Sequence, residues 1–162
     1  MTGDPTPAVT RQPPPPIVLK VFNPLFGALL RSPAHALVDN SFLILHLTGR
    51  RSGKPYDIVV TRHELDGVLT VMTSSPWRLN TQGGADVRVT SRGRNRPGHG
   101  VLVEDVDQVT DAYAAEIARY GWKAAQRSLG LKLAGRAPTR DELRAAVVRD
   151  QFCLIRITFD PS

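Results

Sequence analysis

SFLILHLTGRRSGKPYDIVVTRHEL, residues 41–65, is the stretch that decides the fold. Within residues 41–48, every second position from Leu43 to Leu47 is a leucine, so these three side chains share one face of an extended strand. His46 lies on the opposite face with its even-numbered neighbours, most of them apolar, so both faces of the strand must be covered. Residues 56–65 predict a second strand, and the two runs predict a hairpin closed by a basic, glycine-containing turn.

The rest of the chain supplies more short strands. Asp66-Gly67 predicts a tight hairpin, because a type I′ turn needs positive φ at both central positions. Between residues 91 and 101, Pro97 and several glycines predict an irregular connection. Further strands are expected at residues 68–73, 86–91, 101–104 and 151–159. The pattern therefore predicts a six-stranded antiparallel barrel, mainly β with helices, in the α+β class.

Helices are expected before the first strand and, inserted late, before the last strand. Apolar residues recur at helical spacing between Val109 and Tyr120, and Thr139 with Glu142 forms a T-x-x-E capping box before a later helix. Residues 17–30 predict two short helices interrupted by Pro24. Strands and helices do not alternate regularly, and there is no G-x-G-x-x-G motif, which argues against a Rossmann fold.

The N-terminal residues 1–16 are rich in proline and predict a flexible tail, so one barrel domain is expected over residues 17–162. The start of the chain lacks the pattern of a secretory signal, and Cys153 is the only cysteine. A cytoplasmic location is therefore expected. Peripheral membrane contact through the apolar residues 17–30 remains open beside packing of these residues on the barrel.

The charge balance favours anionic partners. Among 162 residues the formal net charge is +6, and the sequence pI is near 10.1. Such an excess suits phosphorylated cofactors, acidic membranes or nucleic acid, although a basic surface can also serve solubility alone. The four histidines lack metal-ligand spacing, so no metal site is expected.

The densest chemical signal is the turn at residues 48–55, TGRRSGKP. Glycines let a backbone approach an anion closely, and arginine offers planar paired donors to phosphate or carboxylate oxygens. The spacing differs from that of a Walker A loop. Phosphate binding and a merely solvated turn both remain open on spacing alone; the candidate ligands are Arg50, Arg51, Ser52 and Lys54.

A second candidate site follows the third strand. Ser74 or Ser75 is expected to begin a short helix, whose free N–H groups would suit a phosphate. Trp77 is expected to flank a ring system there or to fill the core.

These motifs carry a resemblance that covers roughly residues 22–104 and, more weakly, the last strand. The run LHLTGRRSGKP at residues 45–55, followed by WRLN at 77–80 and DVRV at 86–89, resembles the deazaflavin-dependent nitroreductase or quinone reductase family. That family belongs to the split-barrel flavin and deazaflavin oxidoreductases. The resemblance implies an FMN-binding split-barrel fold, of the kind found in pyridoxamine-phosphate oxidases.

The resemblance also implies a cofactor and a reaction. The cofactor is coenzyme F420, a deazaflavin with an anionic tail that donates a hydride to a small electron-poor acceptor such as a quinone, enone or nitroaromatic compound. The family's patterns imply cofactor contacts from Arg50, Arg51, Ser52, Trp77 and Asn80, with Lys54 as a neighbouring candidate. No catalytic side chain is assigned.

The chain departs from the family pattern at two places. Only Ser74, Ser75 and Pro76 separate the third strand from Trp77, where family members often have a longer loop, and Tyr56 stands where a basic residue is common. FMN therefore stays open as the cofactor, and so does a non-catalytic flavin-binding role. Homodimerisation, which split barrels often use to complete the cofactor site, is also open. Nucleic acid is not expected as a partner, because aromatic residues for base stacking are few.

Overall fold

The computed structural model describes residues 6–12, 28, 33 and 41–161. The chain divides into two compact units, one made of residues 1–13 and 104–153 and the other of residues 14–103 and 154–162. The sequence suggested one domain from residue 17 onward. We call the first the helical unit and the second the barrel unit.

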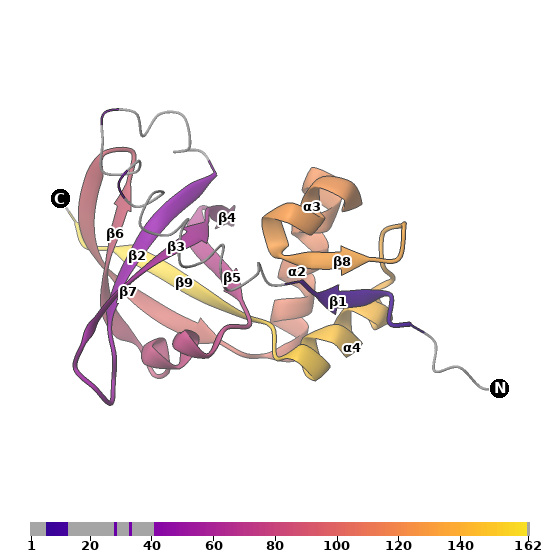
Figure 1. The fold of residues 1–162 in the computed structure, drawn as a ribbon, viewed down its shortest axis with the longest axis horizontal. Helices are drawn as coiled ribbons and strands as arrows, with labels where there is room; N and C mark the ends of the chain where they lie inside the picture. Colours follow the sequence, from indigo (N-terminus) through magenta and orange to yellow (C-terminus); the bar gives the residue numbers. More distant parts are fainter. Residues whose placement is uncertain (1–5, 13–27, 29–32, 34–40, 162) are drawn as a thin grey trace. The chain divides into compact units, whose positions relative to one another are not determined.

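A curled sheet of seven strands forms the barrel unit, in the order β3-β2-β6-β7-β9-β5-β4 (Figure 1). The pairings β2–β3, β2–β6, β6–β7, β7–β9 and β4–β5 are antiparallel. At the two ends of this order are β3 and β4, which follow one another in the chain with only Arg62 between them. The sheet must curl to let one run of chain reach both of its edges, and the predicted α+β split barrel is confirmed as a mainly antiparallel half-barrel. The strands are β2 (Phe42–Thr48), β3 (Pro55–Thr61), β4 (His63–Leu65), β5 (Val68–Thr73), β6 (Ala85–Ser91), β7 (Arg94–Val103) and β9 (Cys153–Phe159).

The inner face of this sheet holds the core of the unit. Leu43, Leu45 and Leu47 are buried there, as the alternation in the sequence predicted. They pack with residues from the strands opposite, namely Leu69, Val71, Val87, Val89, Ile155 and Ile157. Each alternate side chain therefore points away from this core, toward the outer face of the sheet.

Two strand predictions were wrong in detail. Residues 56–65 form two strands rather than one, because the chain crosses at Arg62 from one sheet edge to the other. The connection expected around Pro97 is part of β7, which begins at Arg94. Proline is tolerated because the Pro97 carbonyl faces Asp160, beyond the last β7–β9 pair at Gly98 and Phe159. The proline nitrogen points to the same side, so no ladder hydrogen bond is lost.

The hairpin predicted at Asp66-Gly67 is confirmed, with φ of 52° and 75° at its two central residues. Arg92 and Gly93 turn the β6–β7 hairpin in the same way, with φ of 52° and 69°. Two positive φ angles match the right-handed twist of the flanking strands, which fixes the register of both hairpins.

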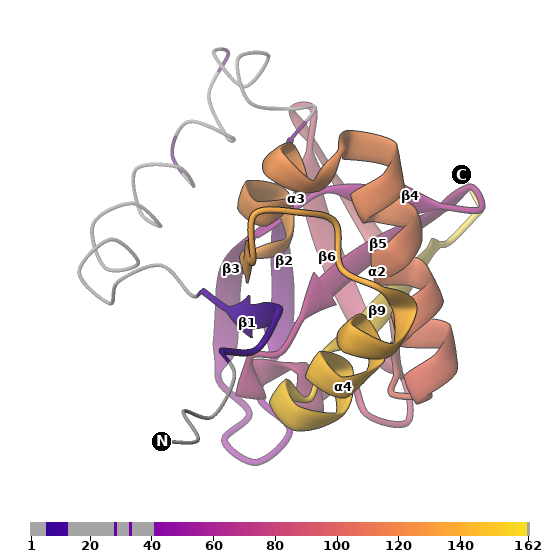
Figure 2. The same cartoon turned by 90° about the vertical axis from the view of Figure 1, so that its right-hand side faces the viewer.

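The helical unit contains α2 (Val106–Tyr120), α3 (Trp122–Leu129), α4 (Arg140–Asp150) and a two-stranded sheet of β1 (Val9–Arg11) and β8 (Leu131–Leu133). Figure 2 shows these elements facing the viewer. The capping box of Thr139 and Glu142 is confirmed at the start of α4. Tyr113 stacks on Phe152 with ring centroids 5.0 Å apart, and burial raises the pKa of the tyrosine hydroxyl.

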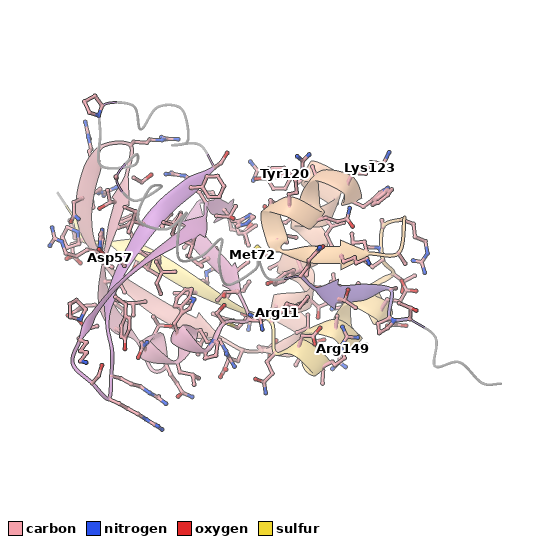
Figure 3. The ribbon with its side chains drawn as sticks, in the orientation of Figure 1. Arg11, Asp57, Met72, Tyr120, Lys123 and Arg149 are labelled. Carbon is pink, nitrogen blue, oxygen red and sulfur yellow. The ribbon has the colours of Figure 1, made fainter. Side chains whose placement is uncertain are left out.

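Strand β1 lies within residues 1–16, which the sequence assigned to a flexible tail. Val9 is buried, and its carbonyl accepts a hydrogen bond from Arg149 of α4, which is labelled in Figure 3. The short apolar-polar alternation of β1 was hidden among prolines. The rest of that tail, apart from residues 6–8 and 12, and nearly all of the helices predicted at 17–30 fall outside the described residues. Among the described residues, no helix is long and apolar enough to cross a bilayer.

Candidate functional site

The basic turn is a compact loop between β2 and β3. Its base is closed at Thr48 and Pro55, which are register partners. Gly49 N–H donates to the Lys54 carbonyl and Gly53 N–H donates to the Gly49 carbonyl, both at 2.8 Å. Gly53 has a φ of 69°, which a residue with a side chain adopts only at a cost. The glycines therefore build the loop itself.

Gly49 is required because two side chains lie against its α-carbon. A Cβ atom there would lie 2.5 Å from Ser52 Oγ and 2.8 Å from Tyr56 Cε2. Ser52 Oγ also accepts the Lys54 N–H at 3.2 Å. Ser52 thus supports the shape of the turn, and Tyr56 covers one side of it.

Arg50 joins the turn to the second predicted site. Its backbone N–H donates to Asn80 Oδ1 at 3.0 Å, and its Nη1 donates to Gln82 Oε1 at 2.8 Å. Asn80 in turn donates from Nδ2 to the Trp77 carbonyl at 3.0 Å. The structure therefore brings together the two motifs that lie about thirty residues apart in the sequence.

The cations of the turn have no carboxylate partner among the described residues. Arg50 contacts only the uncharged amides of Asn80 and Gln82, and Arg51 and Lys54 are exposed with no side-chain partner in the described part of the chain. Three cations and a nearby hydroxyl make a donor set that suits phosphate or carboxylate oxygens. The turn thus fits an anionic tail.

The helix expected after β5 is the six-residue 3-10 helix η2 (Pro76–Thr81). Ser75 occupies its N-cap position, but the side chain makes no capping hydrogen bond. The carbonyls of Ser74 and Ser75 instead accept hydrogen bonds from Nη1 of the buried Arg78, at 3.3 and 3.1 Å. The phosphate contact expected at this helix N-terminus stays a prediction. Trp77 is half-buried and packs against the barrel core. Filling the core was one of the two roles that the sequence left open for it.

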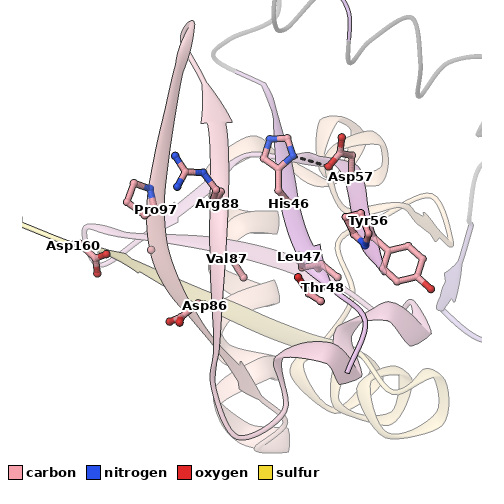
Figure 4. A pocket seen from close by; sticks show the side chains of 12 residues that line it. His46, Leu47, Thr48, Tyr56, Asp57, Asp86, Val87, Arg88, Pro97 and Asp160 are labelled. Carbon is pink, nitrogen blue, oxygen red and sulfur yellow. Dashed lines mark hydrogen bonds and ion pairs between the residues drawn. The ribbon is translucent and has the colours of Figure 1, made fainter. Parts of the chain in front are cut away.

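A hollow of about 370 Å³ opens on the outer face of the sheet (Figure 4). The candidates predicted from the sequence are not among its lining residues, although Thr48, Pro55 and Tyr56 place it beside the base of the turn. The residues around it come from β2, β3, β6, β7 and the end of β9; they are His46, Leu47, Thr48, Pro55, Tyr56, Asp57, Asp86, Val87, Arg88, Pro97, Gly98 and Asp160.

A chain of hydrogen bonds crosses four strands beside this hollow. Arg88 Nε donates to Asn95 Oδ1 at 2.6 Å, and Asn95 Nδ2 donates to Thr90 Oγ1 at 2.9 Å. Thr90 Oγ1 lies 2.7 Å from His46 Nε2, and His46 Nδ1 lies 2.6 Å from Asp57 Oδ1. Since an ionised carboxylate can only accept, the Nδ1 proton of His46 points to Asp57. With a neutral imidazole the Thr90 hydroxyl then donates to Nε2, so each donor in the chain meets an acceptor.

Sequence reasoning did not find this chain. The even-numbered positions of the first strand were assigned to one face, but their neighbours on other strands depend on register. His46 pairs with Asp57 and Arg88 only because β2 is aligned with β3 and β6 as observed. The available signal was His46, a polar ring on the strand face that also carries Phe42 and Ile44. Within the described residues, no group of three or more His, Cys, Asp or Glu side chains is placed to hold a metal ion.

No protein-family model matches the sequence, and no curated protein matches it. Among solved structures, one chain described as a domain-swapped dimer has a TM-score of 0.47 and 12% identity, over 86% of this chain and 98% of its own. The conserved hypothetical protein Rv2991 from Mycobacterium tuberculosis has a TM-score of 0.47 and 15% identity, over 80% of this chain and 81% of its own. The fold assignment rests on the strand pairing described above.

Proposed function

We propose that the chain is an oxidoreductase that binds reduced coenzyme F420 and directs a hydride to a small electron-poor acceptor. The observation that carries the proposal is the basic turn, whose cations have no carboxylate partner among the described residues and whose Arg50 is tied to Asn80. The resemblance of the turn and of the W-x-x-N segment to deazaflavin-dependent reductases supports the choice of cofactor.

The residues of the turn have a binding role in this proposal. Arg51 and Lys54 supply exposed positive charge for phosphate and carboxylate oxygens, while Arg50 is held in place by two amide oxygens. A deazaflavin, when bound, supplies the hydride chemistry itself, so the protein contributes binding and orientation. FMN has a phosphate that the same donor set suits, which makes it the alternative ligand.

The test is a fluorescence titration of the purified full chain with F420 and, separately, with FMN, followed by a turnover assay with a quinone, an enone and a nitroaromatic acceptor. We expect saturable F420 binding and oxidation of reduced F420 by at least one acceptor class. Tight binding with no turnover would favour a carrier, and absence of binding would overturn the proposal.

A charge-neutralising variant tests the site. Arg51→Gln is expected to weaken F420 binding about tenfold, the effect of one charge-assisted contact. Arg127→Gln is the matched control, because Arg127 is also exposed but lies on α3 of the helical unit. If Arg51→Gln and Arg127→Gln bound F420 with equal affinity, the turn would not be the site that holds the cofactor, whether or not F420 binds elsewhere on the protein.

A further inference from the structure

Two opposite charges in the hollow lack partners among the described residues. Arg88 uses Nε to reach Asn95 and leaves its two terminal nitrogens open. Asp160 is held through its backbone, whose N–H lies 3.5 Å from the Pro97 carbonyl, and its carboxylate makes no hydrogen bond or ion pair with a described residue. Pro97 is also the register partner of Arg88, so both charged residues flank the same proline.

Arg88 and Asp160 do not pair with each other, since no ion pair within 4.0 Å joins them. Figure 4 shows them on either side of Pro97. Asn95 fixes the guanidinium of Arg88 on one side, and the Asp160 backbone is fixed on the other. The hollow thus presents a cation and an anion on either side of Pro97.

The other ionisable groups of the hollow decide what it can bind. Asp57 is bonded to His46, and Asp86 is bonded to His99 with Nδ1–Oδ1 at 3.2 Å. Three aspartates and one arginine therefore line the same space, with His46 between them. The aspartates would repel a ligand that carries only a negative charge, and Arg88 would repel a ligand that carries only a positive charge. A ligand with both charges can place each of them beside a group of opposite sign.

Part of the remaining lining is apolar. Pro55, Tyr56 and Pro97 contribute hydrocarbon or ring surface. A volume of about 370 Å³ accommodates a ligand the size of one amino acid with an aromatic side chain.

We propose that this hollow binds a small zwitterion of the α-amino acid class. The carboxylate binds the terminal nitrogens of Arg88, the ammonium group binds Asp160, and an apolar side chain rests on Tyr56 and its neighbours. Pro55 and Tyr56 lie at the base of the turn assigned to F420, whereas Arg88 and Asp160 lie outside it, so the two charged contacts of the zwitterion are separate from the proposed cofactor contacts.

Three matched probes test the site by NMR on the full chain. L-Phenylalanine carries both charges, 3-phenylpropionate only the carboxylate and 2-phenylethylamine only the ammonium group. We expect phenylalanine to shift the His46 ring signals and the Arg88 Nε–H signal, and each single-charge probe to bind about tenfold more weakly. If phenylpropionate or phenylethylamine bound as well as phenylalanine, or if no probe shifted these signals, the proposal would fail.

Three variants locate the binding. Arg88→Gln is expected to weaken phenylalanine binding about tenfold without weakening phenylethylamine, and Asp160→Asn is expected to weaken phenylalanine and phenylethylamine alike. Arg94→Gln is the control, because Arg94 is exposed on the same hairpin but does not line the hollow. All three positions are exposed, so the fold is expected to persist. If Arg94→Gln weakened phenylalanine binding as much as Arg88→Gln did, the effect would come from general surface charge, and the assignment of Arg88 to the site would be wrong.

Discussion

The helical unit and the barrel unit use their arginines differently. In the helical unit, arginines of α4 and the preceding loop pair with carboxylates: Arg136 with Glu142 at 2.6 Å, Arg140 with Asp111 at 2.9 Å, Arg144 with Asp107 at 3.2 Å and Arg149 with Asp150 at 2.6 Å. In the barrel unit, arginines bond to uncharged oxygens: Arg50 to Gln82, Arg62 to Ser91 and Arg88 to Asn95. Each of these bonds fixes a side chain without cancelling its charge.

The composition of the two units has the same bias. The described residues of the barrel unit contain ten lysines and arginines against five carboxylates, whereas those of the helical unit contain nine against eight. Nearly all the net positive charge of the described chain therefore belongs to the barrel. A cation held by an amide or hydroxyl is already oriented toward an anionic ligand, while a cation paired with a carboxylate must first give up that partner. The comparison favours the barrel as the unit for the proposed anion binding, while the arginines of the helical unit form structural ion pairs.

The largest expected effect comes from removing two arginines from each unit in turn. Arg50→Ala combined with Arg51→Ala is expected to weaken F420 binding by about 3 kcal/mol, or about 100-fold, with little change in thermal stability. Arg140→Ala combined with Arg144→Ala removes contacts to Asp107 and Asp111, so it is expected to lower the unfolding temperature and leave F420 affinity unchanged. Fluorescence titration and thermal unfolding measure the two effects. If both double variants lost affinity equally, the contrast between the units would be wrong.

The second prediction tests how rigidly the basic turn is built. Gly49→Ala places a methyl group against Ser52 Oγ and Tyr56 Cε2, so it is expected to destabilise the barrel unit by about 1–3 kcal/mol. Urea denaturation followed through barrel signals measures this loss. In the background of Tyr56→Ala, the Gly49→Ala substitution should cost less stability than it costs in the wild type, because the ring that the new methyl group would meet is absent. An equal cost in the two backgrounds would mean that the ring contact does not set the shape of the turn.

Local patterns in the sequence predicted much of this fold. Alternation identified the buried face of β2, Asp66-Gly67 identified a hairpin, and Thr139 with Glu142 identified the start of α4. Each of these signals is contained within a few neighbouring residues. The division at Arg62 and the passage of β7 through Pro97 depend on which edge of the sheet a strand meets, and no local pattern records that.

The site divides in the same way. The basic turn was visible as a cluster of glycines and cations, and the structure brings it into contact with Asn80 of the second motif. Trp77 was ambiguous because a tryptophan fills a core or flanks a ligand equally well, and here it packs on the core. The hydrogen-bonded chain from Arg88 to Asp57 requires four strands in register, which the sequence does not specify.

A third, smaller effect is expected at the N-terminus of α4. The Thr139 side chain accepts the Glu142 N–H at 3.2 Å, and Glu142 accepts the Thr139 N–H at 2.8 Å. Thr139→Ala removes one half of this capping box and is expected to cost about 1 kcal/mol. Hydrogen exchange of the α4 amides measures it, and Thr139→Ser is the control because serine keeps the capping oxygen. Faster exchange in the serine variant than in the alanine variant would contradict the capping role.

The smallest effect is a pH dependence of the ion pairs that distinguish the helical unit. Hydrogen bonds from Arg136 and then from the Thr139 N–H lower the pKa of Glu142 from 4.5 to about 2. Because the folded protein favours the ionised carboxylate, this contribution to stability is complete above the unfolded pKa and is lost as the pH falls toward 2. The unfolding temperature of Glu142→Gln should therefore lie below that of the wild type at neutral pH, and the difference should shrink below about pH 4.5. Glu104→Gln, an exposed carboxylate with no ion pair among the described residues, should show no comparable dependence. If the difference in unfolding temperature between the wild type and Glu142→Gln stayed constant from pH 7 to pH 2, Glu142 would act through packing rather than charge. The ion pairs would then not distinguish the helical unit from the barrel unit.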